Sequence, residues 1–271
     1  MGRSDPALTY LKSYGYSVVR LPRKDIDPLL LLQRNGRDLS RLGPTDTLFT
    51  EGGKPLPLVS RNVPAADVSG SVATTLSLGL GLSLLGNFLQ AFGADGAGLE
   101  VEYHKAKAVT FEFKDLTSDT INLIDLDKFL ATAKEDLASP HLRNLLEADE
   151  VYCVTTTLKS KSFTVDAKGE SGTKVKVSVP AIQQAVGAKI TVGSDKNTTS
   201  KITYTGQESL VFGFQATQLF FQGGDYTAFK PAGAGSVVLR RPGRTSKTSK
   251  RPAKKSDREY LITDGAFVSL D

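Results

Sequence analysis

The stretch LSLGLGLSLL, residues 76–85, carries two hydrophobic periods at once. Leucine occupies every second position with Ser or Gly between, which is typical of a strand with one apolar face and one small, polar face. From Leu78 to Phe92 the apolar residues also recur at steps of three and four, which is helical spacing. We expect the helix in the resting protein, ending at Gly93, and the strand period marks a second conformation open to the same residues. A helix that stays buried beside the sheet is the alternative.

Alternation elsewhere predicts strands. The first alternating piece runs from Tyr16 to Leu21, and residues 99–113 give the clearest strand pattern. After residue 150, β-branched and aromatic runs separated by Gly, Asp, Asn and Ser predict five more strands. These are VYCVTTTLKSKSFTVDAKG, TKVKVSVP, AKITVG, SKITYTG and SLVFGFQATQLFFQGG. Two of the runs, Val151 to Val165 and Ser200 to Phe214, are rich in Thr and Ser on the face away from the apolar residues.

Helical patterns are fewer. In DIDPLLLLQ, Asp27 can cap a short helical turn with Pro28 at its first position. Residues 121–150 have helical spacing that is broken near Pro140. Residues 51–70 contain three prolines and are expected to be extended or looped. The predicted class is therefore α+β, a twisted, mainly antiparallel central sheet with peripheral helices.

Composition agrees with a soluble domain in a reducing compartment. The chain has 271 residues, of which 39% are hydrophobic and 23% charged, enough for one large domain or two small ones. Cys153 is the single cysteine, so an intramolecular disulfide is impossible. The N-terminal sequence has no secretory pattern. Residues 68–94 are uncharged over 27 positions, but Ser, Thr, Gly, Asn and Gln favour a buried or conditionally inserted segment over a permanent transmembrane helix.

Basic charge is confined to one segment near the C-terminus. Between Arg240 and Arg258 nine basic residues stand against one acid. The whole chain carries +5 and this segment +8, so the rest carries −3, and a globally basic nucleic-acid surface is excluded. The segment can be a linker kept open by charge repulsion, an arm for nucleic acid or an anionic membrane, or a protease-sensitive connection. The third reading explains why a patterned stretch, YLITDGAFVSL, follows it.

Catalytic patterns are missing from the sequence. The two histidines, His104 and His141, have no GxSxG elbow nearby, and Cys/His spacing for zinc is absent. GLGLSLLG and GADGAG lack the spacing of a dinucleotide or phosphate loop. The carboxylates of DLTSDTINLIDLDK do not follow a calcium-loop order and suggest a solvated helix start. Cys153 lies among apolar neighbours as an inert core thiol. We therefore expect neither an enzyme nor a cofactor or metal.

The order of these features resembles a known family. LKSYGYSVVRLPRKDIDPLLLLQRNGRDLSRLGPTDTLF, followed by a Gly/Ser/Leu-rich segment, amphipathic strands and a short C-terminal peptide, is similar to the bacterial gasdermins. The resemblance covers nearly the whole chain and is most specific over residues 10–50. It implies an autoinhibited pore-former of anti-phage defence that is cytoplasmic when intact. A protease encoded nearby, caspase-like or trypsin-like, removes the C-terminal peptide. The body then enters the inner membrane, joins a large ring of identical subunits and kills the cell.

The resemblance divides the chain into three parts. Residues 1–240 would be the pore-forming domain, 241–258 the protease-sensitive linker, and 259–271 the inhibitory peptide packed on the body. Arg241 and Arg251 precede prolines and are poor cleavage points. The better candidates are Arg244, Lys247, Lys250, Lys254 and Lys255. The expected inhibitory contacts are Tyr260, Leu261, Ile262, Phe267, Val268 and Leu270. Many family members carry a lipidated cysteine near the N-terminus, but residues 1–8 contain none, so lipidation is not carried over.

A membrane span made from strands must close into a barrel, because every backbone N–H and C=O must find a partner in lipid, and one subunit can achieve that only by joining a ring. Each spanning strand needs about 9–11 residues. Stretches of this length lie at 76–84, 99–113, 151–165 and around 175–205, enough for two hairpins. The expected membrane-inserting residues are Leu76, Leu78, Leu80, Leu82, Leu84, Leu99, Val101, Tyr103, Val109, Phe111 and Phe113. Lys105 and Lys107 interrupt the second stretch and would have to face the lumen or an interface.

The expected partners would then be the protease, membrane lipids and further copies of the chain, without nucleic acid. The alternative is a soluble binding module with a basic arm for nucleic acid or an anionic membrane surface.

Overall fold

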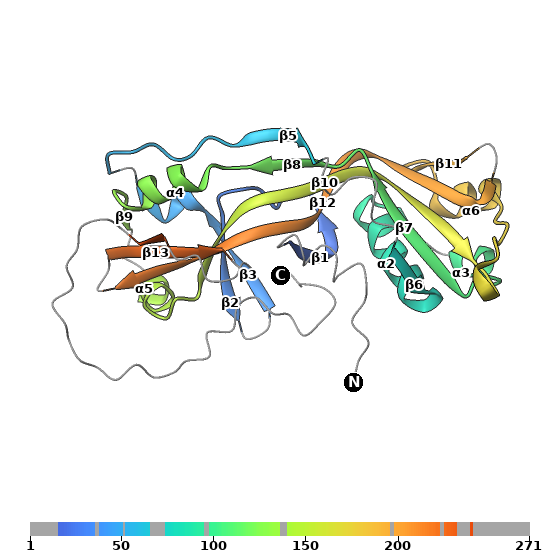
Figure 1. Cartoon of the computed structure of the whole chain (residues 1–271), viewed down its shortest axis with the longest axis horizontal. Coiled ribbons are helices and arrows are strands. Elements are labelled where there is room, and N and C mark those ends of the chain that lie inside the picture. The colour runs from blue at the N-terminus through green and yellow to red at the C-terminus, as the bar shows by residue number, and fades with distance from the viewer. Residues whose placement is uncertain are drawn as a thin grey trace.

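Two long antiparallel strands run the length of the molecule (Figure 1). The computed structural model describes residues 16–35, 38–50, 52–65, 74–94, 98–135, 140–195, 198–222, 225–231 and 239–240. Strand β10 (Val151–Lys168) has 18 residues and β12 (Thr198–Gln222) has 25. They pair from Tyr152 opposite Gln218 to Asp166 opposite Lys201. Other strands flank both of them, so their β-branched and aromatic residues are buried over most of the length.

The remaining elements attach to this pair. The other strands are β1 (Ser17–Arg23), β2 (Leu30–Asn35), β3 (Asp38–Pro44), β4 (Phe49–Thr50), β5 (Ser60–Pro64), β6 (Thr74–Ser77), β7 (Ala108–Lys114), β8 (Thr117–Thr120), β9 (Lys134–Glu135), β11 (Thr191–Asp195), β13 (Asp225–Pro231) and β14 (Leu239–Arg240). The α-helices are α2 (Leu78–Ala91), α3 (Leu99–Glu102), α4 (Leu123–Leu130), α5 (Pro140–Glu147) and α6 (Val179–Val186), and two 3-10 turns span Thr45–Thr47 and Glu170–Gly172. The main sheet has the order β14-β13-β12-β10-β2-β3, and β4 pairs with β9 in a second, two-stranded sheet. The predicted α+β class with a mainly antiparallel sheet is confirmed.

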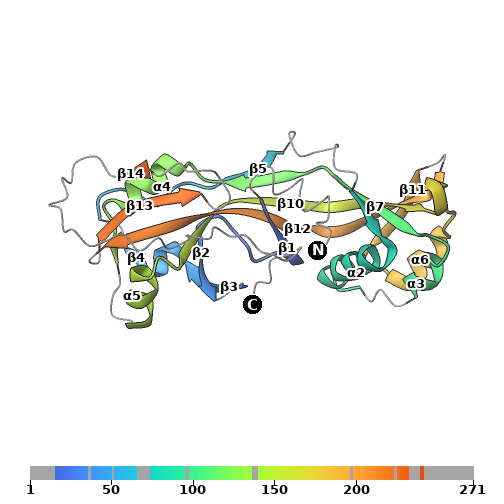
Figure 2. The same cartoon turned by 60° about the horizontal axis from the view of Figure 1, so that its bottom comes forward.

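Helices gather at the two ends of the long strands (Figures 1 and 2). At one end α4 and α5 pack with β2, β10, β12 and β13 around Phe129, Leu146 and Phe229. We call this end the body. At the other end α2, α3 and α6 cover one face of β7 and of the far halves of β10 and β12. We call this end the helical lobe. Its core contains Phe163 and Tyr204 from the two long strands.

A break in the sheet separates body and lobe, and we call it the waist. The sheet partner of β10 changes from β8 to β7 at Asp115 and Leu116, and Asp115 has a positive φ of 53°. In β10 the register shifts between Ser160 and Ser162. The partner in β12 jumps there from Leu210 to Thr205, which leaves Gly206 to Ser209 as a bulge. Bulges bend and twist strands, so the lobe sheet is turned relative to the body sheet.

Several predicted elements are confirmed. The piece at Tyr16 to Leu21 lies largely in β1, and the broken helical pattern gives α4 and α5, the second beginning at Pro140. The helical period of residues 78–92 gives α2. Its end is also as expected, since Gly93 has a φ of 77°, a region that favours glycine.

The predicted helical turn over DIDPLLLLQ is wrong. Leu29 has a φ of 70°, which ends any helical path directly after Pro28, and Leu30 begins strand β2. Leu29 and Leu31 pack in one hydrophobic cluster, and Leu30 and Leu32 pack in another. A strand between two layers buries a continuous apolar run on both faces, whereas a helix of this length would leave part of the run exposed.

The predicted strand over residues 99–113 is wrong in its first half. Leu99 to Glu102 form α3, and only Ala108 to Lys114 form a strand. Leu99 and Tyr103 are both buried, but a spacing of four fits a helix face as well as a strand face. Val101 distinguishes the two, because a strand would bury it with its neighbours and it is 68% exposed.

The prediction for the later runs is corrected in two places. TKVKVSVP is no strand: Lys174 makes an isolated bridge to Lys168, and Ser178 caps α6, with Pro180 in its first turn. SKITYTG and SLVFGFQATQLFFQGG are not two strands, since β12 continues through both. The glycine between them at 206 lies in the waist bulge rather than in a reversing turn.

Candidate functional site: the helical lobe and its attachment

Most of the residues predicted to enter a membrane lie in the core of the helical lobe. Leu99, Tyr103, Val109 and Phe111 are buried there. Leu78, Leu82 and Phe113 are half-buried against the same core. Val101 is exposed and lies outside the core. Leu76 stands opposite Val109 in the β6–β7 pair. The side chains of Leu76, Leu80 and Leu84 lie outside the described part of the structure. Whether any of these residues faces lipid stays a prediction.

Helix α2 is attached to the lobe by one face. Leu85 and Leu89 are fully buried, and the Phe88 ring lies 5.0 Å from the Phe163 ring and 5.5 Å from the Phe113 ring. The opposite side carries small residues that line an open groove, among them Gly79, Ser83 and Gly86. Packing of its apolar face on the sheet therefore stabilises this helix more than its intrinsic helix propensity does.

The end of α2 rests on the waist. The Phe92 ring lies against Gly206, so close that a Cβ at position 206 would come within 2.2 Å of the ring. Any larger residue at this position would force the Phe92 ring to move. The C-terminal end of α2 therefore packs on the bulge in β12.

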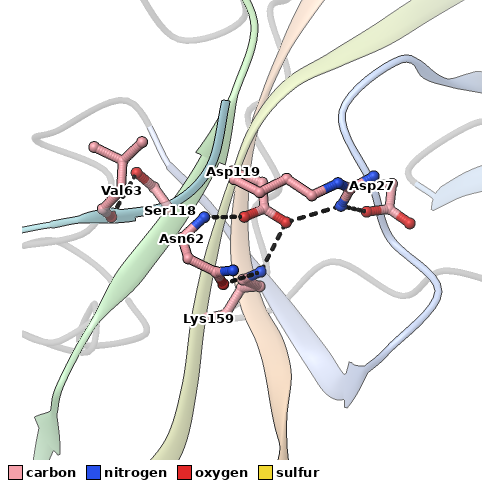
Figure 3. Close-up of polar contacts among 7 residues, drawn as sticks. Asp27, Asn62, Val63, Ser118, Asp119 and Lys159 are labelled. Atoms are coloured by element: carbon pink, nitrogen blue, oxygen red, sulfur yellow. Dashed lines mark hydrogen bonds and ion pairs between the residues drawn. The ribbon is translucent and has the colours of Figure 1, made fainter. Parts of the chain in front are cut away.

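A polar cluster around one buried carboxylate lies on the body side of the waist (Figure 3). Asp119 in β8 is 2% exposed, and its Oδ2 accepts hydrogen bonds from Lys159 Nζ at 2.7 Å and Arg61 NH1 at 3.1 Å. Its Oδ1 accepts the backbone N–H of Asn62 at 2.8 Å. Arg61 also donates to Asp27 Oδ1 at 2.8 Å, and Lys159 donates to Asn62 Oδ1 at 3.0 Å. We call Asp119, Arg61, Asn62 and Lys159 the Asp119 cluster.

Asp119 stays ionised in this cluster. Burial by itself raises the pKa of the carboxyl group, but the hydrogen bonds from Lys159 and Asn62 and the positive charges of Lys159 and Arg61 outweigh it, so the pKa is lowered. The expectation of a solvated helix start is wrong for this carboxylate. Its partners lie 40 to 58 positions away in the chain, and no local pattern signals such a contact.

Other reactive side chains have structural surroundings. Cys153 is fully buried beside the Thr45 hydroxyl at 3.8 Å, and burial raises the pKa of its thiol to about 12, as expected for an inert core cysteine. His104 contacts the Val101 carbonyl, and His141 Nε2 lies 3.3 Å from the Gln33 amide oxygen. Within the described ranges, His, Cys, Asp and Glu side chains form no group of three or more that could hold a metal ion.

Two further findings bear on the membrane and the tail. Among the helices that the structure describes, none has the length and apolar character needed to cross a bilayer. The predicted cleavage points and inhibitory contacts, residues 244–270, lie outside the described residues, as do the proposed linker and peptide.

Comparison with known proteins gives consistent matches. Residues 19–231 match the model of the family described as Bacterial Gasdermin Family. Gasdermin bGSDM from a Desulfuromonadales bacterium is 44% identical over 267 residues, covering 98% of this chain and 97% of that protein. Gasdermin bGSDM from Vitiosangium sp. is 37% identical over 227 residues, covering 83% of this chain and 85% of that one. The solved structure of a bacterial gasdermin from Bradyrhizobium tropiciagri aligns over 99% of this chain and 97% of its own, with a TM-score of 0.64 and 16% identity, which shows a common fold.

Proposed function

The chain belongs to the bacterial gasdermin family, and on that premise we propose that it is an autoinhibited pore-forming protein. Removal of a C-terminal peptide by a protease releases the rest of the chain to insert strands of the helical lobe into the inner membrane and to assemble into a large ring. The resulting loss of the membrane barrier kills the cell in defence against phage. The observation that carries the proposal is the helical lobe, in which helices cover an apolar sheet face. Helices of this length have little stability without such packing.

The strands of the lobe already have the two faces that a membrane-spanning sheet needs. Phe163 and Tyr204 lie on the face covered by the helices, with ring centroids 5.1 Å apart. On the opposite face the hydroxyls of Thr164 and Thr203 lie 2.9 Å apart. If α2, α3 and α6 leave the covered face, the apolar side chains can contact lipid while the Ser/Thr side chains line a water-filled lumen.

Two segments of the chain leave the body, pass through the lobe and return to the body. The first contains β6, α2, α3 and β7, and the second contains the far half of β10, α6, β11 and the far half of β12. Each is long enough to supply two strands of about 9–11 residues. One subunit cannot satisfy the outer backbone groups of such hairpins in lipid, so neighbouring copies must do so in a ring. Lys105 and Lys107 lie at the turn between α3 and β7 and would have to face the lumen or an interface.

Helix α2 is suited to such a conversion. Gly79, Gly81 and Gly86 each lower helix stability by about 1 kcal/mol relative to alanine. Residues 76–84, which include the first half of α2, also carry the leucine alternation of a strand. Strand β6 ends directly before the helix, so a longer strand would continue from it. Loss of the apolar contact with the sheet therefore removes the main support of the helical state.

A cleavage experiment tests the proposal. Residues 245–251 are replaced by the recognition sequence of a site-specific viral protease, and dye release is followed from vesicles of bacterial polar lipids. We expect the intact protein to be silent and the cleaved protein to release dye, because cleavage ends the tethering of the peptide. The unaltered chain treated with the same protease is the control. Equal release before and after cleavage, or silence in both states, contradicts the proposal.

The inhibitory peptide gives a second prediction. While tethered it acts at an effective concentration on the order of millimolar, and its apolar anchors each contribute up to about 1.5–3 kcal/mol if fully buried. We expect Phe267→Asp and Leu270→Asp to release dye without cleavage and to slow the growth of cells that express them. Ser269→Asp adds the same charge to a polar position between them and should stay silent. Silence of all three variants would show that these anchors do not hold the resting state.

A further inference from the structure

The first lobe segment begins and ends at one point of the body. Strands β5 and β8 pair antiparallel, with Ser60 opposite Thr120 and Pro64 opposite Thr117. Directly beyond them the Ala65 N–H donates to the Leu116 carbonyl at 3.0 Å. Everything from residue 66 to 115, including β6, α2, α3 and β7, is therefore a loop of chain closed at its base by the β5–β8 pair.

Apolar burial contributes little to the attachment of β5 itself. All five residues of β5 are exposed, and its one apolar side chain other than proline, Val63, is 39% exposed. A short exposed strand paired on one side has little stability of its own. Besides the backbone ladder, β5 is attached by the Ser118–Val63 and Arg61–Asp27 contacts and by the Asp119 cluster. In this cluster Arg61 and the Asn62 N–H both reach the buried Asp119 carboxylate.

The backbone of β5 is shaped for this contact. Asn62 has a positive φ of 56°, and the β5 register shifts between Ser60 and Val63. This irregularity turns the Asn62 N–H toward Asp119 Oδ1, while Ser118 Oγ donates to the Val63 carbonyl at 3.4 Å (Figure 3). Asparagine tolerates this left-handed conformation better than most non-glycine residues, so the sequence suits the turn that the contact with Asp119 requires.

The same cluster reaches the second lobe segment. Lys159 lies in β10, and three residues later Ser162 begins the pairing with β7 in the lobe. Lys159 is 15% exposed and donates to both Asp119 Oδ2 and Asn62 Oδ1. One buried carboxylate thus connects both ends of the first segment with the start of the second.

Resting on the proposed function, we propose that the Asp119 cluster is a base clamp that stays closed while the lobe rearranges in the membrane. The register of a hairpin is set by its hydrophobic pattern and its turn, and a slip of one residue turns every side chain to the opposite face. Holding the base of the segment fixed restricts such a slip. By fixing β5, β8 and β10 together, the clamp keeps the apolar side chains of both hairpins on one face. Asp119, Lys159 and Arg61 are positioning residues, and they need no contact with lipid.

Charge-removing variants of the cleavable protein test the clamp. We expect Asp119→Asn and Lys159→Met, after cleavage, to bind vesicles as the wild type does in flotation but to release dye at least tenfold more slowly. Lys159→Arg keeps the positive charge and should stay within about threefold of the wild-type rate. Asp125→Asn is the matched control, because Asp125 is an exposed carboxylate that pairs with Lys128 on α4. It should release dye at the wild-type rate.

Amide hydrogen exchange of the intact proteins separates positioning from general damage. In Asp119→Asn we expect exchange to accelerate more in β5 and at Ala65 than in α4 and α5. Wild-type or faster dye release by Asp119→Asn overturns the clamp, as does equal acceleration of exchange throughout the chain or loss of vesicle binding. A cleaved wild type that stays silent contradicts the proposed function instead. The exchange pattern, which needs no membrane, still decides whether Asp119 holds β5 to β8.

Discussion

Replacing Phe88 by alanine should lower the free energy of unfolding by about 3–5 kcal/mol. Phe88 is 4% exposed and is the residue of α2 whose ring lies between Phe113 of β7 and Phe163 of β10, at 5.5 and 5.0 Å. Alanine leaves a cavity between helix and sheet, and the rigid strands below can fill little of it. For a chain of this size the melting temperature should fall by roughly 6–20 °C.

Thermal and urea unfolding measure this effect. The matched control is Ile124→Ala, which removes an apolar side chain that is 60% exposed on α4 and should change the free energy of unfolding by less than about 0.5 kcal/mol. Amide exchange in α2 should rise more in Phe88→Ala than exchange in α5. Equal stability of the two variants would show that α2 is not held by its contact with the sheet, and would remove the physical basis for its release.

Replacing Asp119 by asparagine should lower the free energy of unfolding by about 3 kcal/mol at pH 7, because it leaves the largely buried Lys159 ammonium without its counter-charge. The effect should depend on pH. The folded pKa of Asp119 is lowered below the ordinary value of about 3.9, so the carboxylate stabilises the fold above that value. The contribution is lost as the pH falls through the lower, folded pKa. The charged groups that contact Asp119 are Lys159 and Arg61, and Arg61 also contacts Asp27.

Urea unfolding of wild type and Asp119→Asn at pH 7 and at several points below pH 4 measures this difference. We expect the gap between the two proteins to narrow toward zero in acid. Asp125→Asn, at an exposed carboxylate, should follow the wild type throughout. A gap that stays constant down to the lowest pH at which both proteins fold would mean that the charge of Asp119 contributes nothing.

The lobe shows how far local pattern predicts structure. The spacing of Leu85, Phe88 and Leu89 predicts α2 and its buried face, because a helix buries positions three and four apart wherever it packs. The alternation of Val109 and Phe111 predicts β7 in the same way. Between them, Leu99 and Tyr103 fit both periods, and only packing against α6 and β12 selects the helix for α3.

The body shows where local pattern is insufficient. A run of four leucines from Leu29 gives no period at all, and it became a strand because separate clusters of side chains cover its two faces. The Asp119 cluster has no sequence signal either. A carboxylate between Ser118 and Thr120 is expected at the surface from sequence alone. In the fold, β10 brings Lys159 to it, and β5 brings Arg61 and the Asn62 N–H.

The order of residues along the chain predicts the α+β class, the positions of most elements and the two-period character of residues 76–92, and it carries the resemblance to the gasdermin family. The elements and their periods depend on interactions between residues close together in the chain, which appear as a repeating pattern. The tertiary structure alone decided that β10 and β12 run through both body and lobe, that β5 and β8 close the base of the first lobe segment, and that Asp119 is buried. Each of these joins residues tens of positions apart, and such contacts are fixed by packing and charge compensation in space, which no local pattern records.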